Sequence, residues 1–308
     1  MNGLRAQVDD YLRVRRALGF KLAEHERFLT QFMDYLDQVH ATTITVEYAL
    51  TWARLPVGAG PGWHAVRLSA VRGFAAWART FDPAVQVPPA RMLPFRTTRA
   101  TPYLYTASEI NALMDTATSL HPPLRAATIQ TLIGLLAVTG MRAGEAVGAD
   151  VSDLNLNTGA LTVRGAKFGK SRLLPLHPST TTDALGAYLR VRAHHGATTA
   201  ALLVSTAGTR LTYDNAQRIF KKLTARAGLM PRSGACRPRL HDLRHTFAVN
   251  SLLDAYDSGA DPGERLPLLS TYLGHTEPAN TYWYLHACPE LLAAAANRVD
   301  HHLATVTR

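Results

Sequence analysis

The chain has 308 residues, 47% of them hydrophobic, which is enough to bury a sizeable core and argues against wholesale disorder. Its 33 lysines and arginines exceed its 23 acidic residues, and the formal charge of +10 favours a polyanionic partner, most simply nucleic acid. Two cysteines without metal-ligand spacing predict neither a zinc site nor a disulfide framework, and the lack of a signal peptide or membrane-length apolar run predicts an intracellular protein.

The first 85 residues predict a small helical domain. Apolar residues recur at helical spacing, with His25 as a polar exception, over 4–18, 22–39 and 62–81. Arg72 and Arg79 are seven residues apart, so they share a helix face roughly opposite the apolar one. Residues 61–100 carry six arginines and one acid, and this local excess predicts a DNA-contacting surface made by Arg67, Arg72, Arg79, Arg91, Arg96 and Arg99.

The segment 86–105 predicts an extended basic linker. It contains prolines and arginines, no acidic residue and no usable hydrophobic period. We therefore expect two domains, one on each side of this segment.

The remainder, 106–308, predicts a second domain that is mostly helical with a small antiparallel sheet. Thr106 followed by Glu109 forms a capping box, which starts a helix, and Gly140 closes a long apolar one. The elements expected in chain order are a helix over 123–139, a hairpin over 160–165 and 171–176 around GAKFGK, a helix over 179–194, a short strand at 202–205, a helix over 213–227, and helical structure to the end including 289–303.

Four separated segments of this second domain carry chemically active side chains: TGMRAGEA (139–146), GAKFGKSR (165–172), HDLRH (241–245) and YLGHTEPANTYWYLH (272–286). In the first segment Arg142 follows a helix C-cap and precedes Glu145 by three residues. The second segment places Lys167 near the hairpin tip. In the third, His241 and Arg244 are three residues apart and point from one helix face. The fourth contains a histidine and, nine residues later, a tyrosine.

These residue types suit attack by a phenol on a phosphodiester. A tyrosine hydroxyl has a pKa near 10, so only about 0.1% is ionised at neutral pH and the nucleophile needs a cationic site and a proton acceptor. Guanidiniums match the geometry of phosphate oxygens and stay charged at any working pH. A lysine ammonium can protonate the departing 5′-oxygen. The alternative for HDLRH is a salt-bridged core helix with no ligand.

Arg, Lys, HxxR, LGH and a late Tyr, in this order, resemble the tyrosine recombinase (phage-integrase-like) family over roughly residues 103–300. The resemblance implies a helical core-binding domain at 1–85 and an α+β catalytic domain at 106–308. It implies catalytic roles as follows: Arg142 and Arg244 bind the scissile phosphate, Lys167 is the general acid, His241 and His275 assist proton transfer and hydrogen bonding, and Tyr284 forms a 3′-phosphotyrosyl bond. Glu145 stands where the family often has a supporting acid, and Lys170 and Arg172 are expected to touch backbone phosphates or solvent.

Two of these assignments have rivals nearby. Lys170 competes with Lys167, which the spacing before SRLLPL favours. Tyr282 competes with Tyr284, and on a helix the two side chains point about 200° apart, so both cannot face one phosphate. The nine-residue step from His275 favours Tyr284. The chain also departs from the common family pattern, because the segment between its HxxR and LGH motifs is longer than usual.

The resemblance also implies partners. The substrate is double-stranded DNA in the cytoplasm, at the nucleoid, bound by a homo-tetramer on two paired sites, and accessory DNA-bending proteins can assist. No cofactor is expected, neither ATP nor a metal, because each transesterification stores the broken bond in the phosphotyrosine. The segment LPLLSTYLGH resembles a branch found on transposons, which favours integration or excision of a mobile element.

Three alternatives stay open. A type IB topoisomerase would use a similar pocket to relax DNA as a monomer, and a catalytically inactive regulator would bind DNA through the same fold. The full set of catalytic side chains and a candidate exchange helix argue against these two. The helix at 289–303 is expected to dock on a neighbouring protomer, and the alternative is that it folds back on its own domain.

Overall fold

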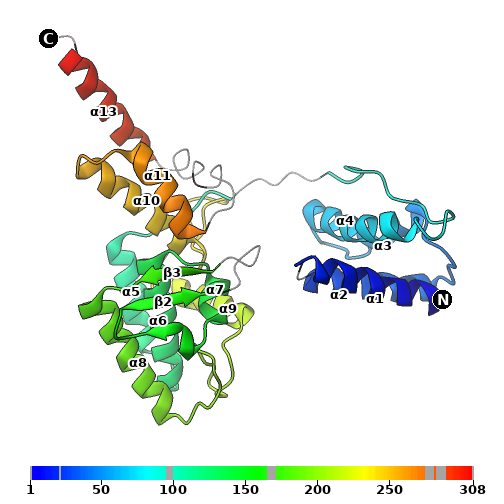
Figure 1. Cartoon of the computed structure of the whole chain (residues 1–308), viewed down its shortest axis with the longest axis horizontal. Helices are drawn as coiled ribbons and strands as arrows, with labels where there is room; N and C mark the ends of the chain where they lie inside the picture. Colours follow the sequence, from blue (N-terminus) through cyan, green and yellow to red (C-terminus); the bar gives the residue numbers. More distant parts are fainter. Residues whose placement is uncertain are drawn as a thin grey trace. The chain divides into compact units, whose positions relative to one another are not determined.

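The computed structural model describes residues 2–20, 22–94, 100–164, 171–274, 281 and 289–306. The chain divides into two compact units, Met1–Arg99 and Ala100–Arg308. Helices predominate in both units, and the second contains one small antiparallel sheet (Figure 1). The predicted fold class, mainly α with a small antiparallel sheet, is confirmed.

The described part of the first unit is built from α1 (Asn2–Ala17), α2 (Ala23–Gln38), α3 (Val46–Arg54) and α4 (Pro61–Ala78). Three of these helices match the periodic stretches of the sequence. The nine-residue α3 is too short to show a clear period, and it begins where the Thr45 side chain accepts a hydrogen bond from the Tyr48 N–H. Aromatic side chains fill the core, with the rings of Phe32 and Trp52 5.1 Å apart.

The predicted linker is shorter than 86–105, because its two ends belong to the two units. Leu93 is buried in the core of the first unit, and the Gln86 N–H donates to the Ile44 carbonyl at 2.8 Å. Tyr103 and Tyr105 are buried in the core of the second unit. The buried side chains of Leu93, Tyr103 and Tyr105 attach the two ends of the predicted linker to the cores of the units, whereas the proline content had suggested an unattached segment.

The second unit contains, in chain order, α5 (Ala107–Thr118), α6 (Pro123–Thr139), α7 (Ala143–Gly148), a 3₁₀ turn η1 (Val151–Asp153), β1 (Leu154–Asn155), β2 (Ala160–Val163), β3 (Arg172–Pro175), a π-helical turn η3 (Pro178–Thr182), α8 (Asp183–His194), α9 (Tyr213–Arg226), α10 (Asp242–Asp257), α11 (Pro262–Leu273) and α13 (Pro289–Val306). The capping box is present at the start of α5, where Thr106 and Glu109 exchange hydrogen bonds. The long apolar α6 is the central helix, and it contacts α5, α8 and α10.

The sheet has the strand order β1-β2-β3, with both pairs antiparallel. Strands β2 and β3 form the predicted hairpin, and their last described pair is Val163 opposite Arg172. The expected strand at 202–205 does not form. One isolated bridge within this stretch pairs Val204 with Arg210, and another directly before it pairs Ala201 with Asp150, so the stretch is held as a buried connection.

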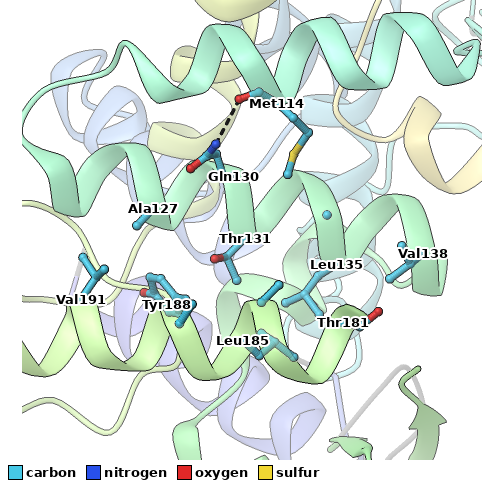
Figure 2. Close-up of a pocket in the computed structure, with 13 residues that line it drawn as sticks. Met114, Ala127, Gln130, Thr131, Leu135, Val138, Thr181, Leu185, Tyr188 and Val191 are labelled. Carbon is cyan, nitrogen blue, oxygen red and sulfur yellow. Dashed lines mark hydrogen bonds between the residues drawn. The ribbon is translucent and has the colours of Figure 1, made fainter. Parts of the chain in front are cut away.

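An apolar hollow of the second unit lies between α5, α6 and α8 and has a volume of about 480 Å³ (Figure 2). Side chains such as Leu135, Leu185 and Tyr188 line it, and Gln130 at its edge donates to the Met114 carbonyl. None of the predicted catalytic side chains lines it, so this hollow is not the candidate active site. Within the described residues, no helix combines the length and apolar character needed to cross a membrane.

Candidate active site

Arg142 is held by the short helix that follows it. The Glu145 carboxylate accepts a hydrogen bond from the Arg142 backbone N–H at 2.8 Å and one from its Nη1 at 2.9 Å. The carboxylate therefore caps the N-terminus of α7 and orients the Arg142 side chain, which stays 33% exposed. The supporting role expected for Glu145 stays a prediction, and these two hydrogen bonds are the contacts that it would use.

His241 and Arg244 stand at the start of α10. The buried Asp242 carboxylate receives two hydrogen bonds from Arg239, at 2.8 and 2.9 Å, and these bonds fix the first turn of the helix. The ring of His245 packs edge-on against the ring of His241, with centroids 4.9 Å apart. Asp242 of HDLRH therefore has a structural role, because it pairs with Arg239 and holds the first turn of α10. His241 and Arg244 are the residues of this segment that belong to the candidate site.

The two predicted phosphate-binding arginines meet at the end of α11. Arg244, only 2% exposed, donates from Nη2 to the Leu273 carbonyl at 2.7 Å and from Nη1 to the Gly140 carbonyl at 2.8 Å. Arg142 donates from Nη2 to the next carbonyl along, Gly274, at 3.1 Å. Side chains from two distant segments are therefore oriented by adjacent backbone groups, directly before His275.

Both helix ends that supply these carbonyls finish on a left-handed glycine. Gly140 closes α6 with φ 58°, and Gly274 closes α11 with φ 67°. A Cβ at Gly140 would lie 2.3 Å from the Phe247 ring, and one at Gly274 would lie 3.0 Å from Nη1 of Arg172. Glycine lets the chain turn at both helix ends without the backbone strain and close contacts that a side chain would bring.

Arg172 completes the cluster. Its Nη1 and Nη2 donate to both oxygens of Glu145, at 3.1 and 2.7 Å, and its side chain is only 14% exposed. Arg172 was expected to touch DNA phosphates or solvent, and here a largely buried carboxylate 27 residues away holds its guanidinium.

Charge and burial set the ionisation of the site. Burial alone would raise the pKa of Glu145, but hydrogen bonds from Arg172 and Arg142 outweigh it and hold the pKa at about 2. Part of the His241 side chain is exposed, yet the protein packed around the ring lowers its pKa to about 4, and positive charge on Arg244 and Arg142 acts in the same direction. A cluster rich in positive charge with a neutral imidazole is suited to bind an oxyanion.

Comparison with known proteins agrees with this geometry. Residues 104–290 match the family model described as the phage integrase family. The protein y4rB of Sinorhizobium fredii, named as an integrase/recombinase, is 43% identical over 97% of this chain and 98% of its own length.

This chain belongs to the phage integrase family. It is therefore a tyrosine-type site-specific recombinase.

Solved structures share the fold of the recombinase. The integrase of transposon Tn1549, in complex with transposon right-end DNA, has a TM-score of 0.62 at 17% identity and covers 96% of this chain and 99% of its own. A lambda integrase tetramer bound to a Holliday junction has a TM-score of 0.59 at 18% identity, covering 89% of this chain and 78% of its own.

Several predicted residues of the recombinase lie outside the described residues. These are Lys167, Lys170, His275, Tyr284, Arg96 and Arg99, together with the rival Tyr282. Of the predicted catalytic set, the structure describes Arg142, His241 and Arg244 and brings them together. The catalytic roles of all six residues of that set stay predictions.

Tyr272 is a neighbour of the site that sequence reasoning missed. Its ring stacks on Phe247 with centroids 5.6 Å apart. Burial raises the pKa of its phenol, and positive charge on Arg172 and Arg244 opposes that rise. Its position two residues before Gly274 in the LGH segment was a usable signal.

The arginines expected to contact DNA from the first unit fall into two groups. Arg67 is only 6% exposed, donates to the Trp52 carbonyl at 3.0 Å and lies 3.7 Å over the Trp52 ring, so it is withdrawn from the DNA-binding set. It precedes Phe74 by seven residues and therefore shares the buried face of α4. Arg79 is exposed, and Arg72 and Arg91 line a hollow of about 290 Å³.

The C-terminal helix α13 begins on its own unit. Leu291 is 1% exposed and packs in a cluster with Ala248 and Leu269, and Arg298 donates to the Ala260 carbonyl at 2.7 Å. Beyond this contact α13 extends past α10 and α11 (Figure 1).

The described residues contain no cluster of His, Cys, Asp and Glu able to hold a metal ion.

Proposed function

We propose that the recombinase cuts and rejoins double-stranded DNA through Tyr284 at a phosphate held by Arg142 and Arg244. The observation that carries this proposal is the shared anchoring of the two guanidiniums by the adjacent carbonyls of Leu273 and Gly274. Held in this way, the two planar cations are oriented before substrate binds, and such preorganised charge favours transition-state stabilisation.

In the cleavage step, the Tyr284 hydroxyl oxygen attacks the scissile phosphorus. A bond forms between that oxygen and phosphorus, and the bond from phosphorus to the 5′-oxygen breaks. Arg142 and Arg244 stabilise the charge that develops on the nonbridging oxygens. Lys167 gives its proton to the departing 5′-oxygen, and the tyrosine proton passes to a neighbouring base.

His241 acts in this step as a neutral imidazole. A pKa of about 4 leaves it uncharged at neutral pH, so it can donate one hydrogen bond to the phosphate and accept a proton. His275, which follows the two anchoring carbonyls in the sequence, supplies the second imidazole. Rejoining reverses the chemistry when the 5′-hydroxyl of the partner strand attacks the phosphotyrosine.

The DNA and the assembly follow from the reaction. Exchange between two duplexes requires four cleavages, so we propose a homo-tetramer on two paired sites, with accessory DNA-bending proteins where the sites are long. This assembly acts in the cytoplasm at the nucleoid. The relative named as an integrase and the fold shared with a transposon integrase favour integration or excision of a mobile element.

The test is covalent trapping on nicked DNA. A nick beside the scissile phosphate lets the short 5′-hydroxyl strand diffuse away, so the 3′-phosphotyrosyl complex accumulates. The probe is a library of nicked fragments of DNA from the cell that encodes the protein. We expect the full wild-type chain to trap DNA covalently and Tyr284→Phe to trap none.

Matched phenylalanine variants test the assignment. Tyr282→Phe and Tyr272→Phe remove the two nearest tyrosines in sequence, and both should still trap DNA. Loss of trapping in either variant with retention in Tyr284→Phe would contradict the proposal. A plasmid that carries two copies of the trapped site should be inverted or deleted, whereas a topoisomerase would only relax it.

A further inference from the structure

Arg172 occupies a structural position that none of the proposed catalytic steps explains. It is the first residue of β3, and its backbone pairs with Val163 at the end of β2. The connection between these two strands carries Lys167 five residues earlier in the sequence, outside the described residues. The Arg172 side chain is thus fixed to the stem of the hairpin that delivers the proposed general acid.

The contacts of Arg172 join this stem to the arginine site. Both oxygens of Glu145 accept from its guanidinium, at 3.1 and 2.7 Å, in a bidentate arrangement. The same carboxylate accepts from the Arg142 side chain at 2.9 Å. One buried carboxylate therefore links the hairpin to the residue that orients the phosphate.

The surroundings make this link rigid. The Arg172 side chain is 14% exposed and that of Glu145 is 11% exposed, so water competes little for the pair. Gly274 lies close enough that a Cβ there would come within 3.0 Å of Nη1 of Arg172. On the opposite stem, Arg164 pairs with the buried Asp153 but is 60% exposed, so that tie is weaker.

We propose that Arg172 is a positioning residue: it clamps the hairpin stem onto Glu145 and so places the general acid, Lys167, at the leaving 5′-oxygen. This inference rests on the proposed function. A lysine cannot replace Arg172, because an ammonium cannot reach both carboxylate oxygens in one plane.

The test compares two leaving groups on the nicked duplex obtained by trapping. One duplex carries the normal 5′-oxygen at the scissile position, and the other carries a bridging 5′-sulfur, which leaves without protonation. We expect Arg172→Lys to cleave the oxygen substrate about 10- to 100-fold more slowly than wild type, as a displaced catalytic group does. On the sulfur substrate its rate should lie within about threefold of wild type.

A double variant tests whether the effect passes through Lys167. Adding Arg172→Lys to Lys167→Ala should cause little further loss on the oxygen substrate, because the acid that Arg172 positions is already absent. Arg172→Met serves as a second substitution with the same expected pattern. Circular dichroism and urea unfolding identify the folded fraction to which each rate is referred.

The control is Arg210→Lys. Arg210 also pairs with a carboxylate, Asp150, and donates to the Val147 and Ala149 carbonyls at 3.0 Å, but at the opposite end of α7. The Arg210→Lys variant should cleave both the oxygen and the sulfur substrate at the wild-type rate.

Equal slowing of Arg172→Lys on the two substrates, or no slowing on either, would overturn the inference. Equal slowing would mean that Arg172 acts on the phosphate or on folding. Failure of the proposed function itself looks different, because the wild-type chain would then trap neither duplex.

Discussion

Arg67 in the first unit and Arg244 in the second are buried to a similar degree, with 6% and 2% of the residue exposed, but their surroundings differ. Arg67 lies over the Trp52 ring and donates to one carbonyl and one side-chain amide inside an aromatic core. Arg244 donates to two helix-end carbonyls within a cluster where positive charge from three arginines acts on His241. Burial alone therefore does not distinguish Arg67 from Arg244, for which we propose phosphate binding, whereas the surroundings of the two side chains do.

The largest effect is expected from lysine substitutions at Arg244 and Arg67, which test whether the two buried arginines differ in function. Arg244→Lys should lower the rate of covalent cleavage about 100- to 1000-fold, because an ammonium cannot keep both carbonyl contacts and face a phosphate. Single-turnover trapping on the nicked duplex measures the rate, and a gel shift should show nearly unchanged DNA affinity. If Arg67→Lys, corrected for its folded fraction, slows cleavage as much, the distinction between the two regions fails.

An alanine substitution at Arg67 tests whether this arginine stabilises the first unit. Arg67→Ala should lower the free energy of unfolding by about 3 kcal/mol, because it leaves a cavity beside Trp52 and removes a donor from a buried carbonyl. Urea unfolding followed by tryptophan fluorescence measures the loss. Arg72→Ala, on the same helix but only partly buried, is the control and should change stability little. An unchanged midpoint in Arg67→Ala would contradict its structural role.

The acid in the catalytic region gives a pH-dependent prediction. The pKa of Glu145 is depressed from 4.5 to about 2, so its ionised form stabilises the fold above the unfolded pKa, and this stabilisation is lost as pH falls through about 2. At pH 7 the free energy of unfolding of the wild type should exceed that of Glu145→Gln by on the order of 2 kcal/mol. This difference in stability should narrow below about pH 4.5. Urea unfolding across this range measures it. A gap independent of pH would contradict the assigned ionisation.

The smallest expected effect concerns the exposed arginines of the first unit. Arg72→Ala should weaken DNA binding by about 1 kcal/mol and reduce the slope of log affinity against log salt by about one, as loss of one phosphate contact does. Titrations of a fluorescent duplex at several salt concentrations give both values. Arg13→Ala, an exposed arginine of α1 paired with Asp10, is the matched control. Equal slopes for the two variants would remove Arg72 from the DNA surface.

Local signals in the sequence predicted much of the fold. The capping box at Thr106 and Glu109 and the glycine at Gly140 predicted the ends of two helices correctly. The hairpin followed from alternating apolar residues around GAKFGK. The two-residue strand β1 was missed, because so short an element carries no readable period.

The site was predictable as a set of residues and not as a set of contacts. Motif order predicted Arg142 and Arg244 together, and the structure joins them through backbone carbonyls whose positions depend on how the ends of α6 and α11 pack. The pair between Arg172 and Glu145 spans 27 residues and depends on how the hairpin packs, so spacing could not reveal it. The burial of Arg67 was readable, because Phe74 lies seven residues after it on the same helix face.

The identity of the nucleophile is the central claim, and peptide mapping of the trapped complex tests it most directly. Trypsin cuts after Arg265 and Arg298, so Tyr272, Tyr282 and Tyr284 lie on one peptide, 266–298. After nuclease digestion of the bound DNA, fragmentation should place the residual nucleotide on Tyr284. A nucleotide on Tyr272 or Tyr282, or on any residue outside this peptide, would contradict the account.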